Sequence, residues 1–231
     1  MGASPEKSTR RRPLSRDRVL RTAAALADEH GLATVTMRNL AQSLGVEAMS
    51  LYHHVPGKEA LLDGLVEVVV DEINAAVPPV DDTGADGWHA ALRARVLAAR
   101  EVLLRHPWAP QLIATRSTIS PAVMRYFDGV LALLRAGGFS WDLAHHALHA
   151  LGSRAMGFTQ ELFAPDDVDA DTATMAELER FAAQVPHLAQ MLAEVTHDDP
   201  GTTLGWCDDQ AEFEFGLDVL LDGLARRLER G

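Results

Sequence analysis

The sequence predicts an all-α protein, with a three-helix N-terminal domain followed by a larger helical domain. Apolar residues recur at helical spacing along most of the chain, and glycines and prolines fall between these periodic segments. Leu and Ala dominate the composition, which favours helices over a sheet. Near the N-terminus, two short helical segments flank a turn that contains Gly45, the pattern of a helix-turn-helix.

The composition narrows the class of protein before any motif is considered. A chain of 231 residues, 47% of them hydrophobic, can bury one sizeable core and a smaller second one. Cys207 is the only cysteine, so no disulfide can form within the chain, which fits a reducing compartment. No run of about 18 apolar residues is present, so we expect a cytoplasmic protein rather than a secreted or membrane-spanning one.

Charge is distributed unevenly along the chain. Residues 1–60 carry nine Lys and Arg against six Asp and Glu, a net charge of +3, whereas the whole chain carries −12, so the remainder carries −15. This asymmetry suggests that one end meets a polyanion while the other stays soluble. A basic disordered tail would produce part of the same pattern, and the charge alone leaves that alternative open.

The elements of the N-terminal domain follow from capping residues and apolar spacing. Residues 1–13 are polar and predict a flexible basic arm. Ser15 caps a first helix that Gly31 ends, and Thr36 caps a second that ends at Gly45. A third short helix runs from Ala48 to about residue 54, before a Pro-Gly pair.

The second and third helices leave an unusual set of side chains facing outward. The second helix buries Leu40 and Leu44, and the third packs Leu51 and Val55 against them. The outward residues of the third helix are small, hydroxyl-bearing, aromatic or imidazole side chains, where a solvent-facing helix would carry Lys and Glu. Such groups suit contact with base edges and phosphates.

The rest of the chain predicts a series of longer helices. A linking helix covers residues 58–77, and a Pro-rich acidic loop follows it to Gly87. Further helices are expected at 88–105, 107–114, 121–136, 140–163, 174–184, 187–197 and 209–230, with a loop at 164–172.

The run from Thr36 to Val55, followed by Gly57-Lys58-Glu59-Ala60-Leu61-Leu62, closely resembles the DNA-binding domain of the TetR family of bacterial repressors. The resemblance implies domains at 14–60 for DNA binding and 61–231 for ligand binding and dimerisation. It also implies the residues that contact operator DNA: Arg38, Ala48, Met49, Ser50, Tyr52, His54 and Lys58. Ala48 departs from the tetracycline repressor, which carries a base-reading amide there, so we expect a different operator.

These contacts are expected to play different parts. Arg38 can form a bidentate pair with guanine, whereas Lys58, at the start of the linking helix, is placed for a phosphate. Tyr52 also has a structural alternative as a half-buried packing residue.

The remainder of the chain resembles, more loosely, the ligand-binding domain of the tetracycline-repressor subgroup, at 106–108, 126–127, 131–139, 145–152 and 213–223. Members of the family dimerise through two helices, and the segments 140–163 and 209–230 are the candidates. The expected interface residues are Leu148, Leu151, Gly152, Ala155, Gly216, Leu217, Leu220 and Leu224. Apolar periodicity alone does not separate this interface from an intrachain core.

A set of apolar and aromatic residues is the candidate lining of an effector cavity, although most of them would also suit an ordinary core. They are Trp88, Leu92, Val96, Trp108, Leu112, Ile113, Tyr126, Phe127, Leu131, His149 and Met156. His145 and His149 share one helix face and suit a divalent metal only if a carboxylate completes the site, so we expect neither a metal nor a cofactor.

The sequence therefore predicts a homodimeric repressor that a small apolar or aromatic effector releases from an inverted-repeat operator. The alternative is a helical small-molecule-binding protein or an enzyme without operator binding. No nucleophile elbow, Gly-rich phosphate loop or zinc-protease motif supports an enzyme.

Overall fold

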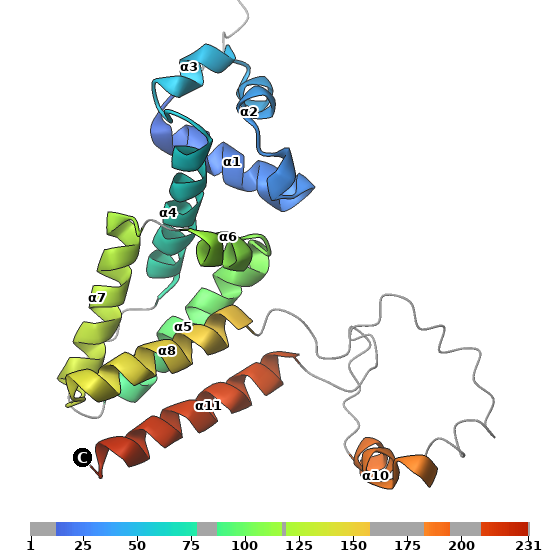
Figure 1. The fold of residues 1–231 in the computed structure, drawn as a ribbon, viewed down its shortest axis with the longest axis vertical. Helices are drawn as coiled ribbons and strands as arrows, with labels where there is room; N and C mark the ends of the chain where they lie inside the picture. The colour runs from blue at the N-terminus through green and yellow to red at the C-terminus, as the bar shows by residue number, and fades with distance from the viewer. Residues whose placement is uncertain (1–12, 78–86, 117–118, 158–182, 195–208, 231) are drawn as a thin grey trace, which may run out of the picture. The chain divides into compact units, whose positions relative to one another are not determined.

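The computed structural model describes residues 13–77, 87–116, 119–157, 183–194 and 209–230. The expectations for the N-terminal arm, Cys207, the loop at 164–172 and most of the helix at 174–184 fall outside these residues. So do the ends of the helices expected to reach residues 163 and 197. Within the described residues every regular element is helical, which confirms the all-α prediction (Figure 1). None of these helices is long and apolar enough to cross a membrane.

The helices follow the expected order closely. Their bounds are α1 (Arg16–His30), α2 (Met37–Leu44), α3 (Ala48–Tyr52), α4 (Lys58–Ala76), α5 (Trp88–Arg105), α6 (Ala109–Thr115), α7 (Pro121–Ala136), α8 (Trp141–Gly157), α10 (Pro186–Glu194) and α11 (Asp209–Leu228). A single 3-10 turn at Leu32–Thr34, which the sequence did not predict, connects α1 to the extended residues before α2.

The caps of α1 and α2 form as their residue types require. The Ser15 hydroxyl accepts a hydrogen bond from the Arg18 amide at 3.2 Å, and Thr36 accepts one from the Asn39 amide at 3.1 Å. Gly45 ends α2 with φ 66° and ψ 40°, the left-handed conformation that a residue with a Cβ adopts only at a cost.

Predicted boundaries are wrong by two residues at the ends of α3 and α11 and at the start of α6. The sequence placed the start of a helix at Pro107, whereas α6 begins at Ala109, with Trp108 as its N-cap residue. Pro110 lies in the first turn, where its missing N–H costs nothing and its fixed φ favours the helix.

The described residues divide into two compact units. The first comprises those within Met1–Pro79 and Ala98–Ala132, and the second those within Val80–Leu97 and Leu133–Gly231. The first unit therefore contains the whole helix-turn-helix and α4, together with α6 and parts of α5 and α7. It thus extends beyond the DNA-binding domain expected at 14–60.

Each unit has its own apolar core. In the first unit α1 packs against α4 and α2, and α2 packs against α3, around fully buried side chains such as Val19, Leu40, Leu51, Leu61 and Leu65. In the second unit α8 and α11 lie side by side (Figure 1), around Leu134, Phe139, Phe213, Leu217 and Leu221. Burial of each such side chain stabilises the folded state by about 1.5–3 kcal/mol relative to leaving it exposed to water.

Candidate functional site

The helix-turn-helix buries the side chains that the sequence assigned to its interior. Leu40, Leu51 and Val55 are at most 1% exposed, and Leu44 is 8% exposed. The turn between the two helices is closed by the amide of Val46, which donates to the carbonyl of Ala41 at 3.0 Å. The relative placement of α2 and α3 is therefore fixed by packing and by a closed turn.

The seven residues expected to contact DNA, here called the reading face, lie on the surface of this motif. They are Arg38, Ala48, Met49, Ser50, Tyr52, His54 and Lys58. Met49 is 73% exposed and Tyr52 is 45% exposed, although both are large, mainly apolar side chains of a kind often found in a core. Arg38 and Lys58 are exposed as well, while Ala48, Ser50 and His54 are partly covered by their neighbours.

The exposure of Met49 and Tyr52 argues for a contact surface. An exposed apolar side chain contributes little to folding, and two large ones on one short helix can form part of a contact surface. With 45% of its surface exposed, Tyr52 also fits the half-buried packing role, so that alternative stays open. Whether the seven residues touch bases or phosphates stays a prediction.

An ion-pair cluster holds the first two turns of α4, directly after Lys58. Arg116, which follows α6, donates to Glu59 at 2.7 Å and to Asp63 at 2.8 Å. These hydrogen bonds, that to Glu59 above all, raise the pKa of the Arg116 guanidinium, and its side chain is only 14% exposed. The position of Lys58 thus depends on a residue 53 positions away from Asp63, a link that no local sequence signal reveals.

A second cluster joins the turn between α5 and α6 to helices α1 and α4. His106 Nδ1 lies 2.8 Å from Asp28 Oδ1, and His106 Nε2 lies 3.1 Å from Glu72 Oε2. The Trp108 indole N–H also donates to Asp28 Oδ1, at 2.6 Å. We call Asp28, Glu72, His106 and Trp108 the carboxylate clamp.

A small cavity of about 220 Å³ lies in the first unit, beside α4. It brings together two of the eleven residues expected to line an effector site, Ile113 and Phe127. Its other lining residues were not in the expected set: Asp63, Val66, Arg116, Ile119, Ser120 and Val123. Val66 could have been found from the sequence, because it belongs to the row of apolar residues along α4. No sequence pattern indicated the ion pair between Asp63 and Arg116.

The other expected lining residues have different surroundings. Trp88 packs edge-on against Phe139, with ring centroids 4.7 Å apart, and Leu92 and Val96 are buried beside it on α5. Trp108 belongs to the carboxylate clamp, and Leu112 is buried on α6. Tyr126, Leu131 and Met156 are partly buried and His149 is exposed. Neither unit gathers all eleven residues around one cavity, and their contact with an effector stays a prediction.

The histidine pair on α8 is close but incomplete as a metal site. The ring centroids of His145 and His149 are 4.6 Å apart, and both side chains are exposed. Across the described part of the chain, no three His, Cys, Asp or Glu side chains are grouped to hold a metal ion. The expectation of a metal-free protein therefore stays a prediction.

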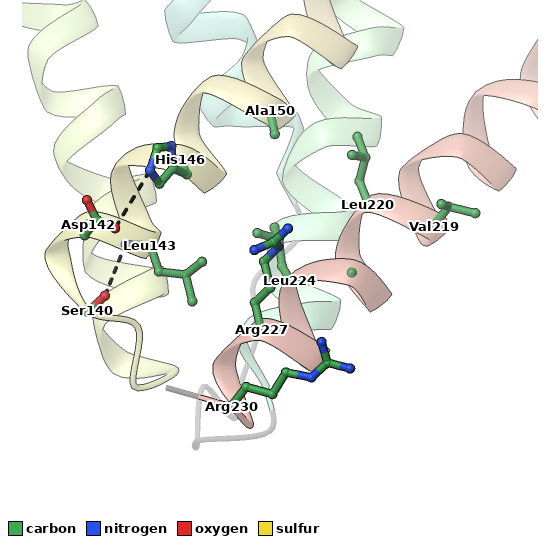
Figure 2. Close-up of a pocket in the computed structure, with 11 residues that line it drawn as sticks. Ser140, Asp142, Leu143, His146, Ala150, Val219, Leu220, Leu224, Arg227 and Arg230 are labelled. Carbon is green, nitrogen blue, oxygen red and sulfur yellow. Dashed lines mark hydrogen bonds and ion pairs between the residues drawn. The ribbon is translucent and has the colours of Figure 1, made fainter.

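A groove between α8 and α11 contains part of the expected dimer interface (Figure 2). Leu220 and Leu224 line it, together with Leu143, Ala150 and Val219. Polar side chains lie at one end, among them Asp142, His146, Arg227 and Arg230. Outside the groove Phe215 and Trp141 are 68% and 66% exposed, so α8 and α11 present apolar surface that the described residues do not cover.

Some of the expected interface residues are used within the chain. Leu217 is fully buried and Leu151 is 4% exposed, so both belong to the core of the second unit. Leu148 and Ala155 are partly buried, and Gly152 is exposed. A Cβ at Gly216 would overlap the guanidinium of Arg154, which donates to the carbonyl oxygens of Glu212 and Phe213. Gly216 therefore makes room for an arginine of its own chain, which sequence periodicity did not reveal.

Comparison with known proteins agrees with this arrangement over the whole chain. The family pattern described as "Bacterial regulatory proteins, tetR family" matches residues 19–65. The pattern described as "Tetracyclin repressor-like, C-terminal domain" matches residues 79–228. The first match covers most of α1, all of α2 and α3, and the start of α4, and the second covers the described helices from α5 onward.

Individual relatives support the same assignment. The HTH-type transcriptional repressor DrrR1 of Streptomyces coeruleorubidus is 32% identical over 91% of this chain and 77% of its own length. The class C tetracycline repressor protein of Escherichia coli is 30% identical, covering 92% of this chain and 91% of that protein.

Solved structures agree in fold. A possible TetR family transcriptional regulator from Streptomyces coelicolor A3(2) has a TM-score of 0.68 at 32% identity, covering 92% of this chain and 99% of the other. Apo ActR from Streptomyces coelicolor has a TM-score of 0.71 at 26% identity, covering 95% and 98%. These relatives are named as regulators, not enzymes, and the chain belongs to the TetR family of DNA-binding transcription regulators.

Proposed function

We propose that this TetR-family regulator is a cytoplasmic repressor that binds an inverted-repeat operator as a homodimer and leaves it when a small apolar molecule binds. The observation that carries the proposal is the exposure of Met49, Tyr52, Arg38 and Lys58 on a rigid helix-turn-helix. The acids nearest to them in sequence are Glu47, the N-cap residue of α3, and Glu59, in the first turn of α4, which pairs with Arg116. A surface of this kind suits a polyanion.

The homodimer is proposed from the uncovered apolar surface of α8 and α11. Phe215 and Val219 are more than half exposed, one turn apart on α11. In an isologous dimer the same surface of a second copy covers such residues, as two-fold symmetry requires. The two reading faces would then meet half-sites roughly 34–36 Å apart, one turn of the DNA helix.

A single substitution tests the dimer. Leu220→Arg places a charge among apolar side chains in the groove between α8 and α11, and we expect a monomer in light scattering at micromolar concentration. His187→Arg, on exposed α10, is a matched control that adds the same charge elsewhere and leaves the dimer intact. A wild-type protein that is monomeric, or a Leu220→Arg variant that remains dimeric, would contradict this assignment.

The effector is proposed from the first unit's cavity and its surroundings. Most of the residues that line the cavity are apolar, and one of them, Phe127, is aromatic. The polar lining residues are Asp63, Arg116 and Ser120. Such a lining favours a ring-containing apolar molecule with a few polar substituents over a sugar or a simple anion. Because relatives are named tetracycline repressors, aromatic polycyclic compounds are the first class to screen.

The decisive experiment combines footprinting with a ligand screen. DNase I footprinting of the region upstream of its own gene should show one protected inverted repeat at nanomolar protein. Aromatic compounds that raise the melting temperature of the protein should then release that DNA in fluorescence anisotropy. Absence of sequence-specific protection, together with tight binding of a compound, would instead support the helical small-molecule-binding alternative.

A further inference from the structure

The carboxylate clamp connects three elements that carry different parts of the proposed function. Asp28 lies in the last turn of α1, and Glu72 lies in the last turns of α4. His106 and Trp108 lie in the turn that joins α5 to α6. Arg105 adds a longer ion pair to Glu72, at 3.5 Å. All of these residues belong to the first unit.

The chemistry of the clamp makes it a specific link. The His106 side chain is 7% exposed, and each of its ring nitrogens faces a carboxylate oxygen. His106 therefore lies within hydrogen-bond distance of the carboxylates of Asp28 and Glu72 at once. Hydrogen bonds to a carboxylate are stronger than those between two neutral groups, and the burial of His106 reduces their screening by water and salt.

Asp28 is held more firmly than a surface carboxylate. Its Oδ1 accepts from both His106 and Trp108, and the Trp108 ring is 8% exposed. The end of α1 is therefore fixed to the turn between α5 and α6 by two donors. The Arg116 ion pairs, in contrast, reach only α4.

Helix α1 transmits its position to the reading face. It packs against α2 and α4, and Gly64 of α4 allows the Leu20 side chain of α1 to approach so closely that a Cβ there would overlap it. Because helices are stiff, a shift at the Asp28 end moves the surface on which α2 rests. Movement of the α5–α6 turn thus acts on both α1 and α4.

We propose that the carboxylate clamp positions α1 for operator binding, so that the α5–α6 turn controls DNA affinity through α1 as well as through α4. This inference rests on the proposed operator binding. With the clamp intact, α1 is ordered before DNA arrives. Without it, α1 loses additional conformational freedom on the operator, which weakens binding.

The test uses full-length protein and a labelled duplex with the inverted repeat mapped by footprinting. His106→Gln keeps one neutral donor group, and Asp28→Asn and Glu72→Gln each remove one carboxylate charge. Each single change should raise the operator Kd about tenfold. The double variant His106→Gln with Asp28→Asn should have the same Kd as either single variant, because both changes break the same link. Glu67→Gln is the matched control: it removes the same charge from α4 and breaks only the Arg16 ion pair. Its operator Kd should change less than about twofold.

Amide hydrogen exchange without DNA separates positioning from unfolding. In His106→Gln the last turn of α1 should exchange faster, while α2 and α3 keep wild-type protection. Loss of protection in α2 and α3, unchanged exchange in α1, or equal effects of Glu72→Gln and Glu67→Gln on operator Kd would each overturn the inference. If the wild-type protein protects no operator, the proposed function fails, whereas the exchange measurement still decides whether the clamp holds α1.

Discussion

The reading face contains Arg38 and Lys58, and we expect their positions to give them different parts in DNA binding. Arg38 lies in the first turn of α2, on a short helix held by the Thr36 cap, so its guanidinium is presented from a fixed backbone. Lys58 begins α4, next to the Glu59–Arg116 ion pair. A planar guanidinium can read a guanine edge, whereas an ammonium acts as a point charge on a phosphate.

Two alanine substitutions distinguish these contributions. Arg38→Ala should weaken operator binding by about 1–3 kcal/mol and relax the preference for one base pair. Lys58→Ala should weaken operator and random DNA alike and reduce the salt slope by about one. Anisotropy titrations at several salt concentrations, with operator and random duplexes, measure both effects. Equal losses on both duplexes for Arg38→Ala would show that this residue does not read a base.

Single residues also mark the limit of what the sequence could predict. The caps at Ser15 and Thr36 act on amides three positions away, so a local pattern suffices to find them. Trp108 was predicted to line the effector cavity and Gly216 to lie in the dimer interface, and both roles stay predictions. Their observed partners, Asp28 for Trp108 and Arg154 for Gly216, are distant in sequence. An indole or a glycine in the sequence can indicate a close contact, whereas only the fold shows which residue makes that contact.

At the scale of elements, the helices were predicted well because helical periodicity is itself a local property. The apolar stripes of α4 and α11 gave both the bounds and most of the buried positions. Contacts between helices were not predicted, since the partner of a stripe depends on the whole chain. The ion pairs from Arg93 on α5 to Asp218 and Glu214 on α11, at 2.7 Å each, illustrate this limit.

These ion pairs predict an acid-dependent contribution to stability. Hydrogen bonds from Arg93 hold the pKa of Asp218 below its ordinary value of 3.8. A depressed carboxyl pKa in the folded state stabilises the fold above the ordinary value, and this stabilisation is lost as the pH falls through the lowered pKa. Arg93→Gln should therefore cost about 1 kcal/mol or less at neutral pH, because Asp218 is 44% exposed. In urea unfolding, the difference from wild type should shrink below pH 3.8. A difference that is constant with pH would contradict this account.

The turn after α7 offers a sharper test of packing between elements. A Cβ at Gly137 would lie 2.6 Å from the Trp88 ring and 2.8 Å from Trp88 Cβ, which is close to the backbone and unable to move aside. Gly137→Ala should thus destabilise the fold by about 1–3 kcal/mol in thermal or urea unfolding. Gly129→Ala, within α7, meets nothing within 4 Å and should stabilise by up to about 1 kcal/mol. If both substitutions stabilised the protein, the close approach of Trp88 to the backbone would be wrong.

At the scale of the whole molecule, the important feature is that the helix-turn-helix and the cavity proposed for the effector share one compact unit. Asp63 and Val66 line the cavity, and they lie on the same helix as Lys58. Arg116 both lines the cavity and pairs with Glu59. The sequence predicted that α4 would link the DNA-binding domain to the rest of the chain, and this role stays a prediction, since α4 lies wholly within the first unit. It did not predict that α6 would hold the first turns of α4.

This arrangement predicts that effector and operator binding are coupled, and that the coupling acts in both directions. A molecule that displaces Arg116 from Glu59 and Asp63 frees the start of α4 and lowers operator affinity, by a coupling typically worth about 1–3 kcal/mol. Thermodynamic linkage then requires operator DNA to weaken effector binding by the same factor. The measurement is the Kd of an aromatic compound found by thermal shift, titrated by fluorescence with and without saturating operator duplex.

A variant shows whether this coupling passes through the α4–α6 ion pairs. Arg116→Gln keeps a polar side chain in the cavity but removes the charge that holds Glu59 and Asp63, so α4 is released whether or not the compound is bound. The variant should therefore bind the operator more weakly than wild type, and the compound should change that affinity little. Operator DNA should in turn have little effect on the Kd of the compound.

If wild-type protein binds the compound equally well with and without operator, the two sites are not coupled. If Arg116→Gln keeps the full coupling factor, the signal travels by another route, such as the carboxylate clamp or the packing of α6 against α4.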